Sequence, residues 1–345
     1  MSLNPVRRHP NATILFLFVA LVALMIFSLM LGRYPVTLRE IAHILATTSP
    51  LHAVGNYTNV PWVVIEIVRL PRILMVTLCG MGLALAGAAM QGIFRNPLVG
   101  PDVVGVSQGA AFGGVLAIIL ALSPMGIVGM AFALGMAGLL MAFLLAKLAG
   151  KASTLALVLS GVIIGSFFGS LVGLAQYVAD PQTQLPSIIY WLLGSFAGAT
   201  YAKVAIVATV TLVAGSVLLL LRWRINLFSL REVDASALGT NLDRLRWVII
   251  TCVVLIVAAQ VSVSGGVGWV GLIIPHAARM LLGPEHKKLL PASAFLGGLY
   301  LLGMDDVARS VGNQEIPIGL LTGVVGAPVF ALLFWKTQTK GWIDE

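Results

Sequence analysis

The few side chains that could do acid–base chemistry in this chain occur as acids and bases close together in sequence. Glu66 precedes Arg69 by three residues, and Asp305 and Asp306 precede Arg309 by four and three residues. On a helix these spacings place an acid and a base on one face, in the favourable acid-before-base order. We therefore predict local ion pairs. Such pairs make a poor proton path, which weighs against an ion-coupled carrier with acidic groups at the middle of a membrane.

Motifs for catalysis or for a bound cofactor are missing from the sequence. Gly150-Lys151 is followed by alanine and lacks the upstream glycine of a phosphate-binding loop, and H-E-x-x-H, C-x-x-C and G-x-S-x-G do not occur. His276 is expected to be a packed residue rather than a ligand. Cys79 and Cys252 lie far apart and give neither a disulfide framework nor a metal-binding spacing. We expect a chain that is not an enzyme, holds no metal or cofactor, and takes any energy other than an ion gradient from another chain.

The composition shows what kind of element must position these residues. Hydrophobic residues make up 59% of the 345 positions and charged residues 10%, and the mean hydropathy is +1.00. Soluble domains have about 25% charged residues, so a soluble enzyme, a disordered chain and a disulfide scaffold are excluded. The class that remains is an all-α polytopic membrane protein, with residues 1–345 forming a single transmembrane domain.

Stretches without a charged residue locate the helices, since a membrane-crossing helix needs about 20 apolar residues. These stretches are 10–32, 73–94, 103–146, 152–179, 181–202, 204–221, 247–278, 289–304 and 316–335. The stretch 103–146 predicts two crossings joined by a turn at 123–126, and 247–278 predicts two shorter crossings broken at 264–268. The stretch 181–202 opens with polar residues and carries aromatic ones, which favours an interfacial helix. The sequence thus predicts ten crossings, or eleven if 184–201 also crosses.

The basic residues predict how the chain is oriented. With ten crossings and a cytoplasmic N-terminus, fifteen of the 21 Lys and Arg residues fall on the cytoplasmic side, as the positive-inside rule requires. Both termini then lie in the cytoplasm. Orientation accounts for the net charge of +8, so no nucleic-acid partner is expected. Arg7-Arg8 followed by a long uncharged stretch predicts a retained first helix rather than a signal peptide.

One internal segment, 222–247, looks soluble. It carries five arginines, three acidic residues and a weak helical pattern. Long loops of this kind are ordinary in membrane proteins, but short amphipathic helices there could also dock in a groove of a cytoplasmic partner. We therefore treat 222–247 as a candidate coupling loop within the transmembrane domain.

Small residues recur every four positions on two of the predicted helices. The residues are Gly161, Gly165, Gly169 and Gly173 on one helix, and Gly80, Ala84, Ala88 and Gly92 on the other. Faces of this type allow helix backbones to approach closely. They predict tight packing inside the chain, or, for the glycine helix, the lining of a pathway or of a seam between subunits.

Several longer motifs follow one another in a recognisable order. Arg69-Leu70-Pro71-Arg72 precedes GMGLALAGAAMQGIFRNPLVGPDVVGVSQGA (80–110), and then come YWLLGSFAG (190–198), VGLIIPHAARMLLGPEHKKLLP (270–291), DDVAR (305–309) and EIPIGLLTGVVGAPVF (315–330). This series closely resembles the FecCD-type permeases. Those are the membrane subunits of binding-protein-dependent ABC importers for ferric siderophores, haem and cobalamin. The resemblance covers nearly the whole chain from about residue 30 onward.

The resemblance implies a fold, partners and a location. It implies the type II ABC importer fold of the cobalamin permease, with ten helices and both termini cytoplasmic, in the bacterial inner membrane. Two permease copies, identical or homologous, would form the pathway at their seam. Two ATP-binding subunits, which use ATP and Mg, and one periplasmic substrate-binding protein would complete the assembly, surrounded by membrane lipid.

The resemblance also implies roles for particular residues. Residues expected to dock the binding protein, in the R-L-P-R and D-x-x-A-R motifs, are Arg69, Arg72 and Arg309. Residues expected to couple to the ATPase are Asp234, Ala237, Leu238, Gly239, Leu242 and Arg244. Residues expected at the cytoplasmic gate are Asn96, Leu98 and Thr154. To these the small-residue spacing described above adds Gly161, Gly165 and Gly169 along the pathway.

The sequence leaves the cargo open. By analogy with the family a ferric siderophore or haem comes first, followed by cobalamin and by oxyanions such as molybdate or tungstate. No Met, Tyr or His pair at helical spacing argues for haem ligation. A reading of another class, an ion-coupled secondary transporter or a channel, also stays open at this point.

Overall fold

The computed structural model describes residues 9–32, 34–47, 60–148, 154–230, 235, 240–312 and 314–338, and every regular element within them is a helix. The α-helices are α2 (Pro10–Met30), α3 (Leu38–Thr47), α4 (Val60–Trp62), α5 (Leu70–Phe94), α6 (Val106–Ile119), α7 (Pro124–Leu148), α8 (Thr154–Val178), α9 (Gln184–Leu193), α10 (Tyr201–Leu220), α11 (Arg222–Ile225), α13 (Leu242–Ser264), α14 (Val270–Leu282), α15 (His286–Ser310) and α16 (Ile318–Gln338). A π-helix, η1 (Val63–Arg69), leads into α5, and two 3₁₀ turns are η2 (Pro101–Val104) and η3 (Asn226–Ser229).

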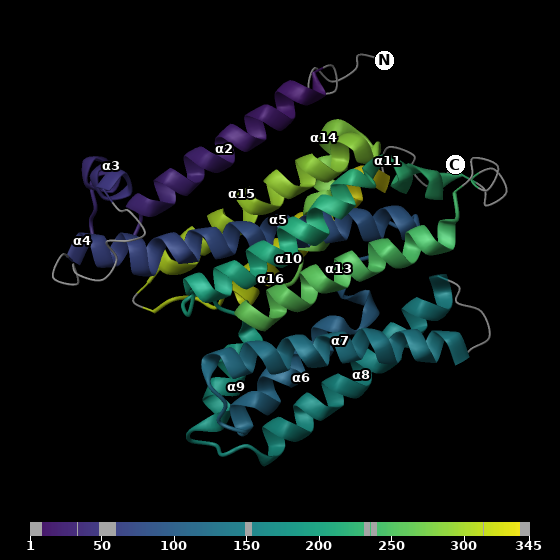
Figure 1. Cartoon of the computed structure of the whole chain (residues 1–345), viewed down its shortest axis with the longest axis horizontal. Coiled ribbons are helices and arrows are strands. Elements are labelled where there is room, and N and C mark those ends of the chain that lie inside the picture. Colours follow the sequence, from purple (N-terminus) through teal and green to yellow (C-terminus); the bar gives the residue numbers. More distant parts are fainter. Residues whose placement is uncertain are drawn as a thin grey trace.

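Six of the described helices are long and apolar enough to cross a membrane. They are Pro10–Met30, Val60–Phe94, Pro124–Leu148, Ala156–Val178, Tyr201–Leu220 and Leu242–Ser264. The helices α6, α14, α15 and α16 run beside them (Figure 1), so the arrangement has room for ten crossings, and that count stays a prediction. Helix α9 has ten residues and is about 15 Å long, half of the hydrocarbon thickness. Residues 184–201 therefore do not form one helix, because α9 ends at Leu193 and α10 begins at Tyr201.

Both predicted breaks exist, but their positions and two helix boundaries are corrected. The turn between α6 and α7 lies at 120–123 and not at 123–126, because Pro124 already opens α7. The break between α13 and α14 lies at 265–269, one residue beyond the predicted one. The helix predicted from residue 73 instead begins at Val60, because Glu66, Arg69 and Arg72 each find hydrogen-bond or ion-pair partners inside the protein. The candidate coupling loop is shorter than 222–247, since α13 already begins at Leu242 with Asn241 as its N-cap.

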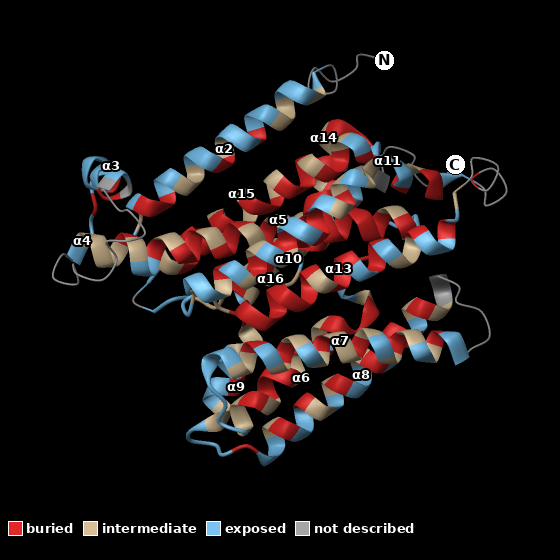
Figure 2. Cartoon of the chain, in the orientation of Figure 1, coloured by how far each residue is buried: buried red, intermediate tan, exposed pale blue. Residues whose placement is uncertain are grey.

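Helix α5 is the centre of the fold. It packs against α15, α13, α14 and α10. In its most apolar stretch 83% of the residues are buried, whereas in α2, at the edge of the bundle, 22% are (Figure 2). The helices α6, α7, α8 and α9 form a second group that meets the first where α7 and α6 contact α13 (Figure 1). The chain therefore has a densely buried central helix and a more exposed side bundle.

The predicted small-residue face of α5 packs inside the chain. A Cβ on Gly80 would collide with the Gly297 carbonyl of α15, and a Cβ on Gly297 would collide with the Gly80 carbonyl. Farther along α5, Gly87 meets the backbone of Gly271 on α14 in the same way. The backbones of three helices thus touch with no side chain between them, which is the close approach that small residues permit.

A second close contact joins three elements through their backbones. The Ser195 amide, after α9, donates to the Ser264 carbonyl at the end of α13 (2.8 Å), and the Ile318 amide that opens α16 donates to the Gly194 carbonyl (3.1 Å). Gly194 and Gly265 have φ of +74° and +72°, a region that favours glycine. We call this contact the α9–α13–α16 junction.

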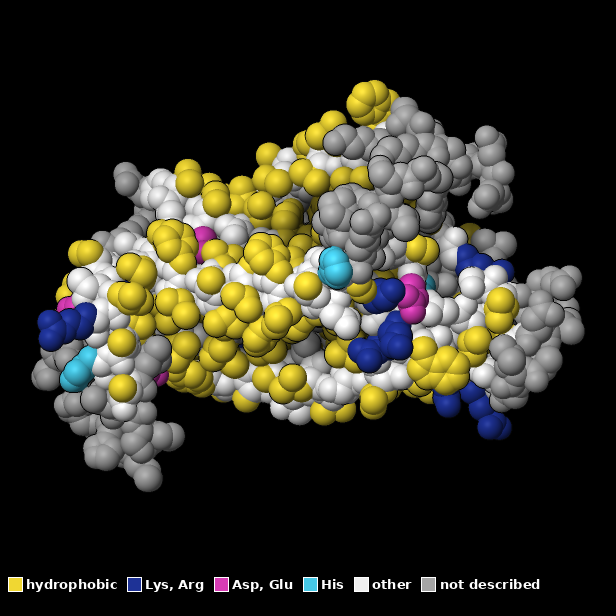
Figure 3. Space-filling view, turned by 90° about the horizontal axis from the view of Figure 1, so that it is seen from above, with side chains coloured by type: hydrophobic (Ala, Val, Ile, Leu, Met, Phe, Trp, Pro, Cys, Tyr) yellow, Lys and Arg dark blue, Asp and Glu magenta, His cyan; other side chains and the backbone are white. Residues whose placement is uncertain are grey.

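Hydrogen bonds identify which helix ends lie together. The Arg72 end contains the start of α5, the ends of α2 and α15 and the residues before α16, and the His286 end contains the end of α5, η3 and the start of α15. The face in Figure 3 is largely hydrophobic in its middle, with basic side chains toward its two ends. That distribution suits a protein whose middle part lies in the hydrocarbon core of a membrane.

We predict that Gly297→Val lowers the thermal stability of the detergent-solubilised protein, because the new side chain must separate α15 from α5. The expected loss is about 1–3 kcal/mol of unfolding free energy, or more if the backbone cannot move. Gly303→Val is the matched control, since Gly303 lies on the same helix with open space around it. Thermal unfolding of both variants tests this, and equal midpoints would contradict the packing role.

Candidate functional site

Arg72 is the centre of a buried ion-pair cluster. It lies in the first turn of α5 after Pro71, and its side chain is 9% exposed. Its Nε and Nη2 donate to the Asp305 carboxylate, at 2.9 Å to Oδ2 and 2.9 Å to Oδ1, and its Nη1 lies 2.9 Å from both oxygens of Glu315. The planar guanidinium thus joins α5, α15 and the segment before α16, a bidentate geometry that arginine favours.

Arg309 ties α15 to the end of α2. Its Nη2 donates to Asp306 Oδ1 and to the Ser28 carbonyl, both at 2.6 Å, and its Nη1 donates to the Leu31 carbonyl at 2.8 Å. The Ser28 hydroxyl also donates to Asp306 Oδ1. The predicted pair between Asp306 and Arg309 is confirmed, and Asp305 belongs mainly to Arg72, with Arg309 Nε 4.0 Å away.

The predicted pair between Glu66 and Arg69 is wrong. Arg69 donates to the carbonyls of Leu29 and Tyr34, both at 2.6 Å, while Glu66 accepts from the Tyr201 hydroxyl at 3.0 Å. Both residues lie in the π-helix η1. Because a π-helix bonds i to i+5 and holds more residues per turn, residues three apart no longer share a face.

The three arginines predicted to dock a binding protein therefore share one property. Arg69, Arg72 and Arg309 are nearly buried, and carboxylates or carbonyls of this chain occupy their donors. A partner's carboxylate would have to compete with these internal acceptors. Their docking role stays a prediction, and the structure adds that they hold four helix ends together.

At the His286 end, a hollow of about 500 Å³ opens between the end of α5, α11 with η3, and the start of α15. Its lining residues are Gln91, Gly92, Arg95, Asn96, Pro97, Ile225, Asn226, Ser229, Arg279, Pro284, Glu285 and His286. Asn226 Oδ1 accepts from the backbone amide of His286 at 3.0 Å and lies 2.7 Å from its Nδ1. Arg279 has no carboxylate within ion-pair distance among the described residues. The hollow is a polar recess with an arginine available for a partner.

The comparisons with known proteins agree with one another. The model of the FecCD transport family matches residues 20–336. The chain belongs to this family. The molybdate import system permease protein MolB of Haemophilus influenzae is 44% identical over 93% of this chain and 94% of its own. The cobalamin import system permease protein BtuC of Halobacterium salinarum is 34% identical over 93% and 95%.

A solved structure extends the similarity to three dimensions. An inward-facing conformation of a metal-chelate type ABC transporter superposes with a TM-score of 0.85 at 42% identity, covering 94% of this chain and 99% of that one. This FecCD permease is therefore a multi-pass membrane protein of the ABC transporter permease type. Its similarity to permease subunits implies that it carries no ATPase site of its own.

Within this FecCD permease, the predicted gate residues lie near the His286 end. Asn96 lines the hollow, and its side chain accepts from the Leu98 amide at 2.9 Å, while Leu98 is 49% exposed. Thr154 begins α8. The structure thus brings Asn96 and Leu98 together in the turn after α5.

The predicted coupling residues divide into two groups. Asp234, Ala237, Leu238 and Gly239 lie outside the described residues. Leu242 and Arg244 form the first turn of α13, where Leu242 is buried against the core and Arg244 is exposed. Of this described pair only Arg244 has an exposed side chain, and its coupling role stays a prediction.

The glycines of α8 divide along the helix. Gly161 packs against the backbone of η2 at Val103 and Val104, and Gly165 has ordinary contacts with Gln108 and Gly105. Gly169 and Gly173 have open space where a Cβ would stand. Gly161 and Gly165 therefore pack inside the chain, whereas Gly169 and Gly173 leave room for another helix.

Two partners of the arginines escape sequence reasoning. Glu315 lies 243 residues from Arg72, and Ser28 lies 281 residues from Arg309. The EIPIG motif containing Glu315 is visible as part of the family resemblance, but nothing local connects it to Arg72. Ser28 sits within an apolar helix and gives no signal at all.

We predict that Arg72→Gln lowers stability by about 3–5 kcal/mol, because it leaves the buried Asp305 carboxylate without its main partner. Arg39→Gln, at an exposed arginine on α3, is the control and should have little effect. Thermal unfolding measures both, and adding Asp305→Asn to Arg72→Gln should recover part of the loss. If the two single variants unfold at the same temperature, the cluster does not stabilise this end of the bundle.

Proposed function

We propose that this FecCD permease is one of two membrane subunits of an ATP-driven importer, and that its cargo is a metal-bearing anion or chelate. Molybdate, or a similar oxyanion, is the first candidate. The observation that carries it is the 44% identity to a molybdate import permease over 93% of the chain. A ferric chelate, which ranked first by analogy with the family, is now the second candidate. It is supported by the 42% identical structure of a metal-chelate type transporter.

The chemistry of the described residues suits a cargo that keeps its own ligands. No group of three His, Cys, Asp or Glu side chains among them could hold a metal ion, so a bare cation would find no coordination sphere. An oxyanion or a chelate needs only a pathway of suitable width. Recognition of the cargo then belongs to the periplasmic binding protein.

The distribution of charge supports the orientation. Of the basic residues whose side chains are described, nine lie toward the His286 end and five toward the Arg72 end. The first group is Arg95, Lys147, Arg222, Arg224, Arg244, Arg246, Arg279, Lys287 and Lys288, and the second is Arg39, Arg69, Arg72, Lys203 and Arg309. By the positive-inside rule the His286 end faces the cytoplasm. The partner ATPase, which uses ATP and Mg, would contact this end, beside the hollow that contains Asn96 and Arg279.

The second permease copy would lie along α8. Gly169 and Gly173 leave open space on that helix, and Leu159, Val162 and Phe167 are at least half exposed on it. A close-packing partner is the ordinary use of such a face in a membrane. The binding protein would sit at the Arg72 end, where its carboxylates would share the arginines with Asp305, Asp306 and Glu315.

We predict that vesicles containing this permease with its ATPase and binding protein accumulate radiolabelled molybdate only when ATP is present on the side of the membrane that carries the ATPase. A proton or sodium gradient without ATP should give no uptake, because the described acidic residues are held in local ion pairs or hydrogen bonds rather than in a proton path. Uptake of a ferric siderophore, measured in parallel vesicles, tests the second candidate cargo against molybdate. Gradient-driven uptake by the permease alone would overturn the importer proposal.

We predict that Gly169→Leu weakens association of the two copies by about tenfold or more, as expected from about 1–3 kcal/mol of overpacking. The stability of the single chain should not change, since its own atoms do not fill that space. Gly129→Leu on α7, another open glycine, is the control. Dimer dissociation measured by mass photometry reports the result, and equal behaviour of the two variants would remove α8 from the seam.

A further inference from the structure

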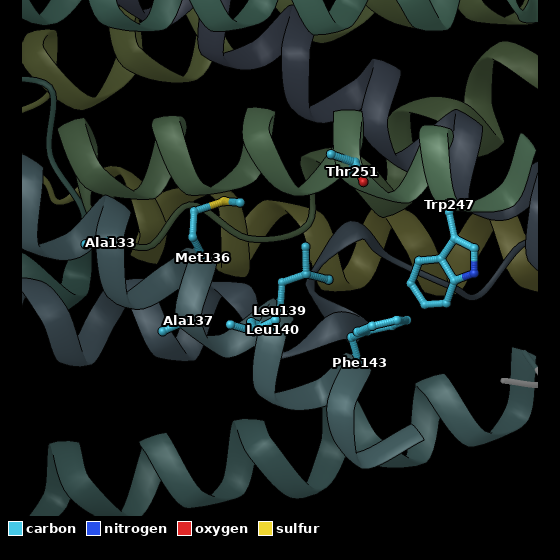
Figure 4. Close-up of a pocket in the computed structure, with 8 residues that line it drawn as sticks. All are labelled: Ala133, Met136, Ala137, Leu139, Leu140, Phe143, Trp247 and Thr251. Carbon is cyan, nitrogen blue, oxygen red and sulfur yellow. The ribbon is translucent and has the colours of Figure 1, made fainter. Parts of the chain in front are cut away.

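A groove lies between α7 and α13 on the side of the bundle. It has a volume of about 680 Å³ and is lined by Ala133, Met136, Ala137, Leu139, Leu140, Phe143, Trp247 and Thr251. Figure 4 shows Trp247 pointing from α13 toward Phe143 of α7, and their rings meet edge to face with centroids 4.7 Å apart. Leu140 is 57% exposed, so the groove opens outward. We call it the α7–α13 groove; its only polar lining side chains are the Trp247 indole and the Thr251 hydroxyl.

A smaller basic hollow of about 290 Å³ lies at the cytoplasmic end of the same helix. Its lining residues are Leu221, Arg224, Thr240, Asn241, Arg244, Leu245 and Val248. Neither Arg224 nor Arg244 has a carboxylate within ion-pair distance among the described residues. Arg224 stacks near the Trp223 ring, 5.6 Å from its centroid, and Trp223 is 54% exposed. Two guanidinium groups without an acid partner in the described part of the chain therefore stand at the level where interfacial tryptophans are usual.

One face of α13 connects the basic hollow with the groove. Arg244, Trp247, Val248 and Thr251 stand at positions i, i+3, i+4 and i+7, which share a helix face. Arg244 and Val248 line the hollow, while Trp247 and Thr251 line the groove. Seven residues of helix rise about 10 Å, so the charged and apolar parts lie within the length of one lipid.

We propose that an anionic phospholipid binds along this face, with its phosphate between Arg224 and Arg244 and one acyl chain in the α7–α13 groove. Arginine binds phosphate through its fork of N–H donors, and basic pockets between helices on the cytoplasmic side hold acidic headgroups. The inference goes beyond import. It assigns Arg244 a role in lipid binding in place of the predicted role in ATPase coupling.

Charge argues against a second permease copy as the occupant. A twofold contact through this face would present the same patch from both subunits, and each chain carries a net charge of +8. Arg224 and Arg244 of both copies would then approach one another without an acid among the described lining residues. A lipid phosphate removes that repulsion, while its tail covers the groove.

The test uses the permease–ATPase complex in nanodiscs of phosphatidylcholine with increasing fractions of tail-brominated phosphatidylglycerol. Bromine quenches nearby tryptophans, so the difference between wild type and Trp247→Phe isolates the groove. We expect saturable quenching at low phosphatidylglycerol, and brominated phosphatidylcholine should quench Trp247 only in proportion to its amount. Arg224→Gln and Arg244→Gln should each raise the half-saturating fraction about fivefold.

Arg39→Gln is the matched control, since Arg39 is an exposed arginine on α3 at the opposite end. Ala137→Phe, which narrows the groove without touching an arginine, should reduce retained phosphatidylglycerol in native mass spectra. Three results would each overturn the proposal. They are equal quenching by both headgroups, no Trp247-dependent quenching because another chain covers the groove, and arginine variants that release the ATPase while lipid binding stays unchanged.

Discussion

The structure depends on the contact of α5 with its neighbours at the level of bare backbone. At Gly80 and Gly297 two helices touch through carbonyls, and at Gly87 and Gly271 a third helix does the same. In lipid no hydrophobic drive holds helices together, so packing contacts of this density must supply the stability. With α5 held this closely, the start of that helix is fixed relative to the end of α15, and the Arg72 guanidinium falls between Asp305 and Glu315.

The ion pairs at that end follow from the same constraint. A charge that is removed from water must be paired or hydrogen-bonded, because its isolated burial is costly. Arg72 and Arg309 meet this requirement with three acids, and Arg69 meets it with two carbonyls. The result is an Arg72 end at which four helix ends share charged contacts. At the opposite end, Arg224, Arg244 and Arg279 have no acid partner among the described residues and can bind phosphate, carboxylate or a partner protein.

Much of this arrangement could be predicted from local sequence. Uncharged stretches predicted the main helices, and turn residues predicted two breaks that lie within three residues of the observed ones at 120–123 and 265–269. The pair of Asp306 with Arg309 followed from helical spacing. Three features could not be predicted that way. The π-helix before α5 changed the face on which Glu66 lies, and tertiary hydrogen bonds to Glu66 and Arg69 let the helix extend to Val60. The partners Glu315 and Ser28 are more than 240 residues from their arginines. Each depends on tertiary contact rather than on residue type or spacing.

The α9–α13–α16 junction gives the protein a stiff mechanical link. Side-chain contacts absorb small movements by changing rotamers, whereas backbone amides bonded to backbone carbonyls have no such slack. At this junction the Ser195 and Ile318 amides donate hydrogen bonds to the carbonyls of Ser264 and Gly194. Because glycines lie at the contact, no side chains separate the backbones. A displacement of the short helix α9 therefore acts directly on the end of α13 and the start of α16. These are two of the longer helices, so a local movement at the junction reaches along much of the protein.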